Sequence, residues 1–112
     1  MKKYSGIVGA GEKRAELLGF PTVNIPLGDA TSGIYAARVI VAGKEYHAAV
    51  YADQRRKLLE AHLLDFSGDV YGEKIIVELL KKIRDDKRFT DDEALHAAIG
   101  DDISKVRTYF GK

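Results

Sequence analysis

Cysteine is absent from this chain, and so are several other features that would narrow its function. Without cysteine there is no disulfide, no thiolate metal site and no cysteine nucleophile, which fits a reducing compartment. The sequence has no apolar run long enough to span a bilayer and no basic-then-apolar leader segment. We therefore expect a cytoplasmic protein that has no membrane partner.

An excess of charge of one sign is also lacking. The 18 basic residues are nearly balanced by 17 acidic ones, for a formal net charge of +1. Such a chain has no global field that attracts nucleic acid, and it lacks the basic aromatic stripe of a small RNA-binding barrel. We expect no nucleic-acid partner, and any bound anion must be held locally. The motifs G-x-x-x-x-G-K-[ST], G-x-G-x-x-G and G-x-S-x-G are missing, which excludes the standard nucleotide fingerprints and the simplest hydrolase.

The length and composition of the chain are those of an ordinary globular protein. The length of 112 residues allows one hydrophobic core, and hydrophobic and charged residues make up 46% and 31% of the chain. We expect one domain over residues 1–112 and a monomer.

Most of the apolar pattern is typical of strands. The expected strands are Tyr4 to Val8, Gly33 to Val41, Lys44 to Tyr51, Leu58 to Phe66 and Lys74 to Ile83. The second and third of these form a hairpin, because only Ala42-Gly43 separates them. By composition the fourth suits a helix or a strand. We interpret it as a strand, since a glycine-containing turn and another strand-like run follow it.

The last part of the chain has a helical pattern. Thr90 and Glu93 have the spacing of a capping box, which predicts a helix that begins there. Phe89 would then be its hydrophobic staple. Apolar residues recur at helical spacing at Leu95, Ala98, Ile99, Ile103, Val106 and Phe110. This stripe must pack against the rest of the protein, either as one helix or as two helices broken at Gly100 with Asp101 and Asp102. Several antiparallel strands plus one helix favour a small closed barrel, because closure removes exposed sheet edges.

Pro21 opens a segment that carries two neutral oxygen donors. Proline favours extended backbone around it, so Thr22 and Asn24 should project from one face. Two neutral oxygens suit a Mg²⁺ ion that brings phosphate oxygens and waters with it. The alternative is a turn entering a strand, in which both side chains bond local backbone.

Glu60 and His62 alternate with leucine and alanine on the expected fourth strand, so they should share one face. A carboxylate on a rigid strand could accept a proton from a substrate hydroxyl as a general base. The alternative is a pair of solvated residues on a sheet surface.

Two loop segments contain further candidates. Gly9 to Gly19, with Lys13 inside it, could cradle a phosphate or be a plain surface loop. Arg84 and Phe89 could stack on a flat ring, unless Phe89 acts only as the staple.

These segments occur in an order that resembles the riboflavin kinase family. The matching stretches are GFPTVNIP, SGIYAARV, LLEAHLLDFSGDVYGEKI and IRDDKRFTDDEAL, followed by a closing helix. The resemblance extends from Tyr4 to Phe110. It implies a mainly β fold, a six-stranded antiparallel Greek-key β-barrel with a C-terminal α-helix. It also implies transfer of the ATP γ-phosphoryl group to riboflavin, which gives FMN and ADP.

Site roles follow from the resemblance by matched position. Glu60 would be the catalytic base, and Thr22 and Asn24 would hold Mg²⁺ or another divalent cation against the nucleotide. The nucleotide-binding residues would be Gly9, Gly11, Lys13, Gly19, His62 and Phe66. The flavin-binding residues would be Arg84, Asp86 and Phe89.

The chain departs from the family pattern in two places. In the Gly9 to Gly19 segment, Ala15 and Glu16 stand where the family usually has a glycine and a basic residue. Residues 51–57 form a shorter connection before Glu60 than the family usually has. Arg55, Arg56 and Lys57 could supply phosphate contacts from this short loop, or the pocket could be incomplete. In the latter case the chain would be a flavin- or nucleotide-binding module with weak or no kinase activity. Many members are fused to an adenylyltransferase domain, which we expect this chain to lack.

Overall fold

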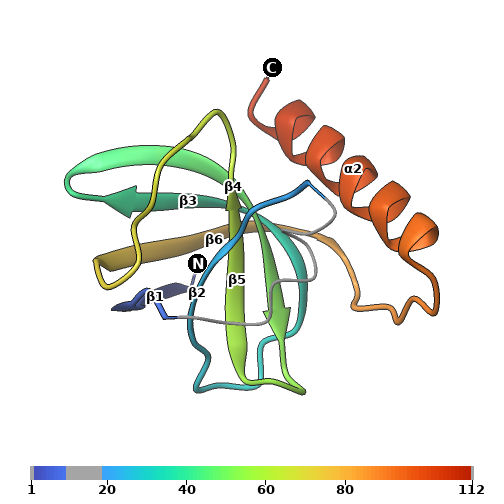
Figure 1. Cartoon of the computed structure of the whole chain (residues 1–112), viewed down its shortest axis with the longest axis horizontal. Helices are drawn as coiled ribbons and strands as arrows, with labels where there is room; N and C mark the ends of the chain where they lie inside the picture. The colour runs from blue at the N-terminus through green and yellow to red at the C-terminus, as the bar shows by residue number, and fades with distance from the viewer. Residues whose placement is uncertain (1, 10–18, 112) are drawn as a thin grey trace.

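The computed structural model describes residues 2–9 and 19–111, and this part of the chain contains six strands and one helix. The strands are β1 (Lys3–Ile7), β2 (Val23–Pro26), β3 (Gly33–Val41), β4 (Lys44–Asp53), β5 (Leu58–Leu63) and β6 (Lys74–Arg84). The helix is α2 (Asp92–Tyr109), which lies against the outside of the sheet (Figure 1).

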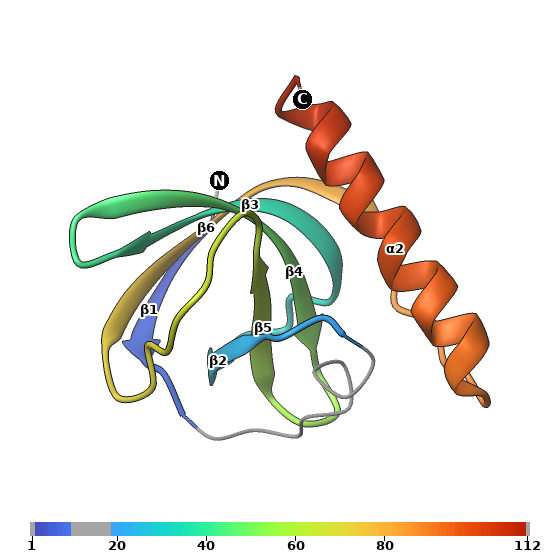
Figure 2. The same ribbon diagram turned by 45° about the horizontal axis from the view of Figure 1, so that its top comes forward.

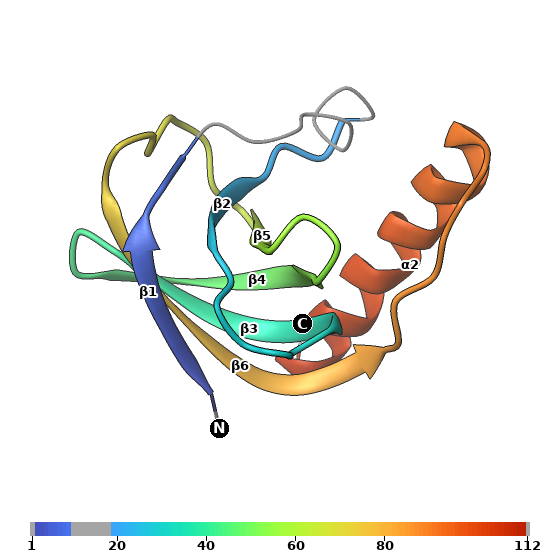
Figure 3. The same cartoon turned by 90° about the horizontal axis from the view of Figure 1, so that it is seen from below.

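The six strands form one antiparallel sheet in the order β1-β6-β3-β4-β5-β2. The sheet curls so that its edge strands β1 and β2 approach each other (Figure 2 and Figure 3). There the Gly9 N–H donates to the Asn24 carbonyl at 3.0 Å. A Cβ at Gly6 would lie 3.1 Å from the Ile25 Cβ, so glycine permits this close approach. The barrel is therefore nearly closed, and the predicted fold class is confirmed.

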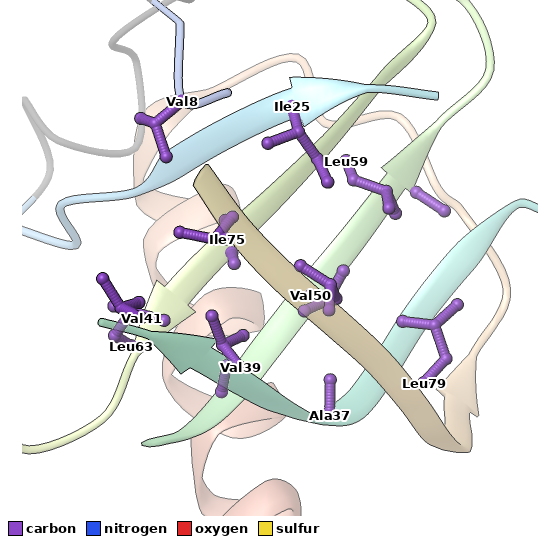
Figure 4. Close-up of a cluster of buried hydrophobic side chains, with 14 of the residues drawn as sticks. Val8, Ile25, Ala37, Val39, Val41, Val50, Leu59, Leu63, Ile75 and Leu79 are labelled. Atoms are coloured by element: carbon purple, nitrogen blue, oxygen red, sulfur yellow. The ribbon is translucent and has the colours of Figure 1, made fainter. Parts of the chain in front are cut away.

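Alternation along each strand separates a core face from an outer face. On β4, Ala48, Val50 and Ala52 are fully buried inside the barrel. Figure 4 shows Val50 among aliphatic side chains that converge from the other strands. The intervening residues Ala49 and Tyr51 consequently face outward, toward the side on which the helix lies.

The predicted strands are present, with shifts at their ends. The β3–β4 hairpin is confirmed, and its turn residues Ala42 and Gly43 have φ values of 50° and 79°, as a two-residue hairpin turn requires. The strand predicted to reach Phe66 stops at Leu63. Asp65 has a φ of 56°, a left-handed conformation that cannot continue a strand. The other bounds differ by one or two residues.

The helix begins one residue later than its sequence pattern suggested. Asp91 is the N-cap, and its Oδ1 accepts a hydrogen bond from the Ala94 N–H at 2.7 Å. The capping box at Thr90 is therefore wrong, because the neighbouring aspartate is at least as good a cap. Phe89 then lies two residues before the cap and is not at the staple position. Gly100 does not break the helix, which is continuous over its 18 residues.

The C-terminal half of α2 attaches the helix to the barrel. Val106 is fully buried against Ala36 and Leu64, with Ile103 and Phe110 packed beside it. The Phe110 ring also stacks on His47 with a centroid distance of 3.7 Å. The apolar stripe thus has its packing partner in this half of the helix.

A polar cluster joins β1 to the loop after β2. The Asp29 carboxylate accepts hydrogen bonds from the Thr31 N–H at 3.0 Å and the Tyr4 hydroxyl at 2.8 Å. The Thr31 N–H and then the Tyr4 hydroxyl lower the pKa of Asp29 to about 2. Gln54, in the loop after β4, donates its side-chain amide to the carbonyls of Asp29 and Thr31. The cluster therefore also anchors the β4–β5 loop.

We expect this cluster to make stability depend on pH in the acid range. A carboxylate whose folded-state pKa is depressed from 3.8 to about 2 contributes stability above its unfolded value, and this is lost as pH falls through about 2. Because the Asp29 side chain is 44% exposed, solvent screening limits the effect to under about 1 kcal/mol. Thermal unfolding of Asp29→Ala and wild type should therefore differ at pH 6, and the difference should shrink toward pH 2. A constant difference across this range would contradict the assignment.

Candidate active site

A cavity of about 420 Å³ lies between the outer face of the barrel and α2. Its walls come from β4, the β4–β5 loop, β5, the segment before β2, the segment before the helix and the N-terminal half of α2. The lining residues that matter below are Phe20, Thr22, Tyr51, Asp53, Arg55, Arg56, Glu60, His62, Arg84, Lys87, Arg88, Phe89, Leu95, Ile99 and Asp102. This volume is sufficient for a small organic molecule.

Strand β5 contributes two polar side chains to the cavity lining. Leu59 and Ala61 are in the barrel core, so the alternation predicted from the sequence places Glu60 and His62 together on the cavity side. Glu60 is buried, with 7% relative exposure for the residue, and is not a solvated surface residue. His62 Nδ1 lies 2.7 Å from the Pro21 carbonyl oxygen, which ties β5 to the segment before β2.

The register of β2 on β5 brings the three central candidates together. Asn24 lies directly opposite Glu60 in this antiparallel pair, and directly opposed residues project from the same face with Cβ atoms about 5 Å apart. Thr22, just before β2, lines the cavity together with Glu60, whereas Asn24 is buried and is not among the lining residues. The sequence nominated these residues, and the strand register makes Asn24 a direct neighbour of Glu60.

This donor set fits one kind of metal binding. In the described residues no group of three or more His, Cys, Asp or Glu side chains could hold a metal ion alone. One hydroxyl, one amide and one nearby carboxylate suit a Mg²⁺ ion that keeps waters and brings phosphate oxygens. The residues thus fit a cation that arrives with a nucleotide.

Arg56 connects Glu60 to a second carboxylate. Its Nε donates to Asp53 Oδ2 at 2.6 Å, and its Nη2 donates to Glu60 Oε1. Asp53 is 1% exposed and also accepts from the Arg55 N–H at 3.0 Å. Burial alone would raise the pKa of Asp53, but the hydrogen bonds from Arg56 outweigh it and leave the pKa below its usual value. Sequence reasoning missed Asp53, although an aspartate before a short polar loop is an Asx-turn signal.

The predicted flavin residues lie at the end of β6 and after it. Arg84 forms a bidentate pair with Asp102 of α2 at 2.7 and 2.8 Å, and its guanidinium carbon is 5.7 Å from the Phe89 ring centroid. Both Arg84 and Phe89 line the cavity. Asp86 accepts from the Tyr51 hydroxyl at 3.0 Å without being part of the lining. Tyr51 and Asp102 were missed by the sequence reasoning.

The predicted nucleotide residues are dispersed. His62 lines the cavity, whereas Gly9 bridges to Asn24 through its backbone and Gly19 is exposed with a φ of 92°. Phe66 packs edge-on against Tyr46, with centroids 5.0 Å apart, and is not among the lining residues. Gly11 and Lys13 lie outside the described residues.

The fold and the site define a small β-barrel with a polar, partly basic cavity between its outer face and one helix. A family model described as riboflavin kinase matches residues 2–110. The bifunctional riboflavin kinase/FMN adenylyltransferase of Escherichia coli (strain K12) is 38% identical over 117 residues, which cover 96% of this chain. The chain spans about 37% of the length of that relative. It belongs to the riboflavin kinase family.

Two solved structures share the fold. Riboflavin kinase from Trypanosoma brucei superposes with a TM-score of 0.69 at 26% identity, covering 98% of this chain and 80% of that one. A Streptococcus pneumoniae protein named a macrolide-efflux protein has a TM-score of 0.81 at 27% identity, covering 94% of this chain and 38% of that one. No helix in residues 2–9 and 19–111 has the length and apolar character needed to cross a membrane.

Proposed function

We propose that the chain transfers the γ-phosphoryl group of ATP to the 5′-hydroxyl of riboflavin, giving FMN and ADP. The observation that carries this proposal is the position of Glu60: a buried carboxylate that faces Asn24 across β2 and β5 and shares a cavity with Thr22. Phosphoryl transfer depends mainly on positioning and charge neutralisation, and this site offers both.

Each group has a distinct role in this proposal. Glu60 accepts the proton of the attacking hydroxyl as the oxygen–phosphorus bond forms, and the bond to the ADP oxygen breaks. Thr22 and Asn24 would hold the divalent cation, which supplies charge neutralisation at the phosphates when it is bound. Phe89 and the apolar side of α2, including Leu95 and Ile99, offer surface for the flavin ring.

The direct experiment is incubation of the purified chain with riboflavin, ATP and MgCl₂, followed by chromatography for FMN. We expect FMN to form in proportion to protein, and to be lost when ATP is omitted or EDTA is added. A folded protein that binds riboflavin without making FMN would contradict the proposal. It would leave the binding module as the function of this barrel.

A further inference from the structure

The cavity carries more positive charge than the nearly neutral chain requires. Among the described residues its lining contains five basic side chains and three acidic ones. The basic residues are Arg55, Arg56, Arg84, Lys87 and Arg88, and the acidic residues are Asp53, Glu60 and Asp102. A partly enclosed wall with this imbalance favours an anionic ligand.

Two of the five basic residues are already paired with acids. Arg56 is bonded to Asp53 and Glu60. Arg84 is bonded to Asp102 through both oxygens of the carboxylate. These two arginines pair with all three acidic side chains of the lining. The excess positive charge therefore comes from the other three basic residues of the lining.

Arg55, Lys87 and Arg88 form what we term the cationic edge. Within residues 2–9 and 19–111 none of them makes an ion pair with an acidic side chain. Among the described residues the Arg55 side chain donates a hydrogen bond to the neutral Tyr51 hydroxyl alone, at 3.4 Å. Lys87 Nζ lies 5.7 Å from the Phe89 ring centroid. Their charges are therefore available to a ligand in the cavity.

Arg55 is held in place by its loop. Asp53 accepts the backbone N–H groups of Arg55 and Arg56, and Gln54 is bonded to the carbonyls of Asp29 and Thr31. The Tyr51 hydroxyl, which accepts from Arg55, donates to Asp86 and so links this loop to the segment that carries Lys87 and Arg88. A positioned guanidinium loses less entropy when it binds an anion.

We propose that the cationic edge, with Arg55 as its main contact, binds a phosphate group of the ligand in the cavity. This rests on the proposed function and makes it more specific. Of the three basic residues of the short β4–β5 loop, only Arg55 is suited to the task. Arg56 is occupied by two carboxylates, and Lys57 donates to Gln54 at 2.7 Å and is not in the lining.

The test compares ligands that differ by a phosphate. Riboflavin and FMN are titrated by flavin fluorescence and Mg-ADP by calorimetry, against wild type, Arg55→Met, Arg55→Lys and the control Lys57→Met. We expect Arg55→Met to weaken FMN or Mg-ADP by about tenfold or more, since a charged hydrogen bond is lost, and riboflavin by less than about twofold. Arg55→Lys should recover part of the loss, and Lys57→Met should leave all three affinities unchanged.

The two phosphate ligands distinguish the source of the anion. A loss confined to FMN supports a contact with the flavin phosphate, and a loss confined to Mg-ADP supports a contact with the nucleotide. Normal affinity of Arg55→Met for both, with riboflavin bound as in wild type, overturns this inference and leaves the proposed function standing. A wild-type protein that binds none of the three ligands overturns both.

Discussion

We expect Glu60→Gln to lower kcat for the proposed FMN formation by about 10²- to 10⁴-fold, which is the contribution of a general base. Glutamine keeps the size of the side chain and one acceptor oxygen, but it cannot take the hydroxyl proton. The affinity for riboflavin should change by less than about twofold, because the lost interaction belongs to the transition state. Steady-state kinetics and flavin fluorescence titration measure the two quantities separately.

Glu60→Gln also weakens one bond of Arg56, so the experiment needs a matched control. Arg56 keeps its bond to Asp53, which should preserve the local fold. Glu45 on the β3–β4 hairpin is an exposed glutamate that is paired with Arg38 at 3.6 Å and lies outside the cavity lining. Glu45→Gln should keep kcat within about twofold of wild type. Near-normal kcat in Glu60→Gln would contradict the assignment of this residue as the base.

The barrel could be predicted because its local signals agree. The β-branched runs, the Ala42-Gly43 turn and the helical stripe each point to the element that forms. The N-cap could not be located, since Thr90 and Asp91 are both good caps and only the folded geometry selects one. The end of β5 was misjudged because nothing in the composition marks the left-handed Asp65.

The candidate site was also predicted only in part from the sequence. Residue types at matched positions were sufficient to nominate Glu60, Thr22 and Asn24. The pairing of Asn24 with Glu60 is a register between strands that are far apart in sequence, and no local pattern encodes it. The basic loop was also left open: its three cations look alike in sequence, yet the structure gives Arg55, Arg56 and Lys57 different partners.

The environment of Asp102 was the feature of the site that the sequence pattern predicted worst. Beside Gly100, Asp102 suggested a helix break, whereas it is 4% exposed and pairs with Arg84. Its position between Ile99, Ile103 and Val106 on the packed side of the helix was the available signal, because a charge there needs a partner. The hydrogen bond to Asp102 raises the pKa of Arg84 above its usual value, so the arginine keeps its charge.

Breaking the Arg84–Asp102 pair is expected to cause a large loss of stability. Arg84→Met would leave the buried Asp102 carboxylate without its bidentate partner, and breaking a buried pair from one side costs about 3 kcal/mol. For a domain of this size that lowers Tm by roughly 10–15 °C. Lys105→Met is the control, because Lys105 pairs with Asp101 on the exposed side of the same helix and should cost under about 0.5 kcal/mol.

The double variant Arg84→Met/Asp102→Leu separates the cost of an unpaired charge from the loss of a favourable contact. If the penalty arises from the stranded carboxylate, removing that carboxylate should restore most of the unfolding free energy that Arg84→Met loses. Chemical denaturation of the four proteins in the cycle measures this coupling. A double variant no more stable than Arg84→Met would show that Arg84 stabilises the helix through its stem and its contact with Phe89 instead.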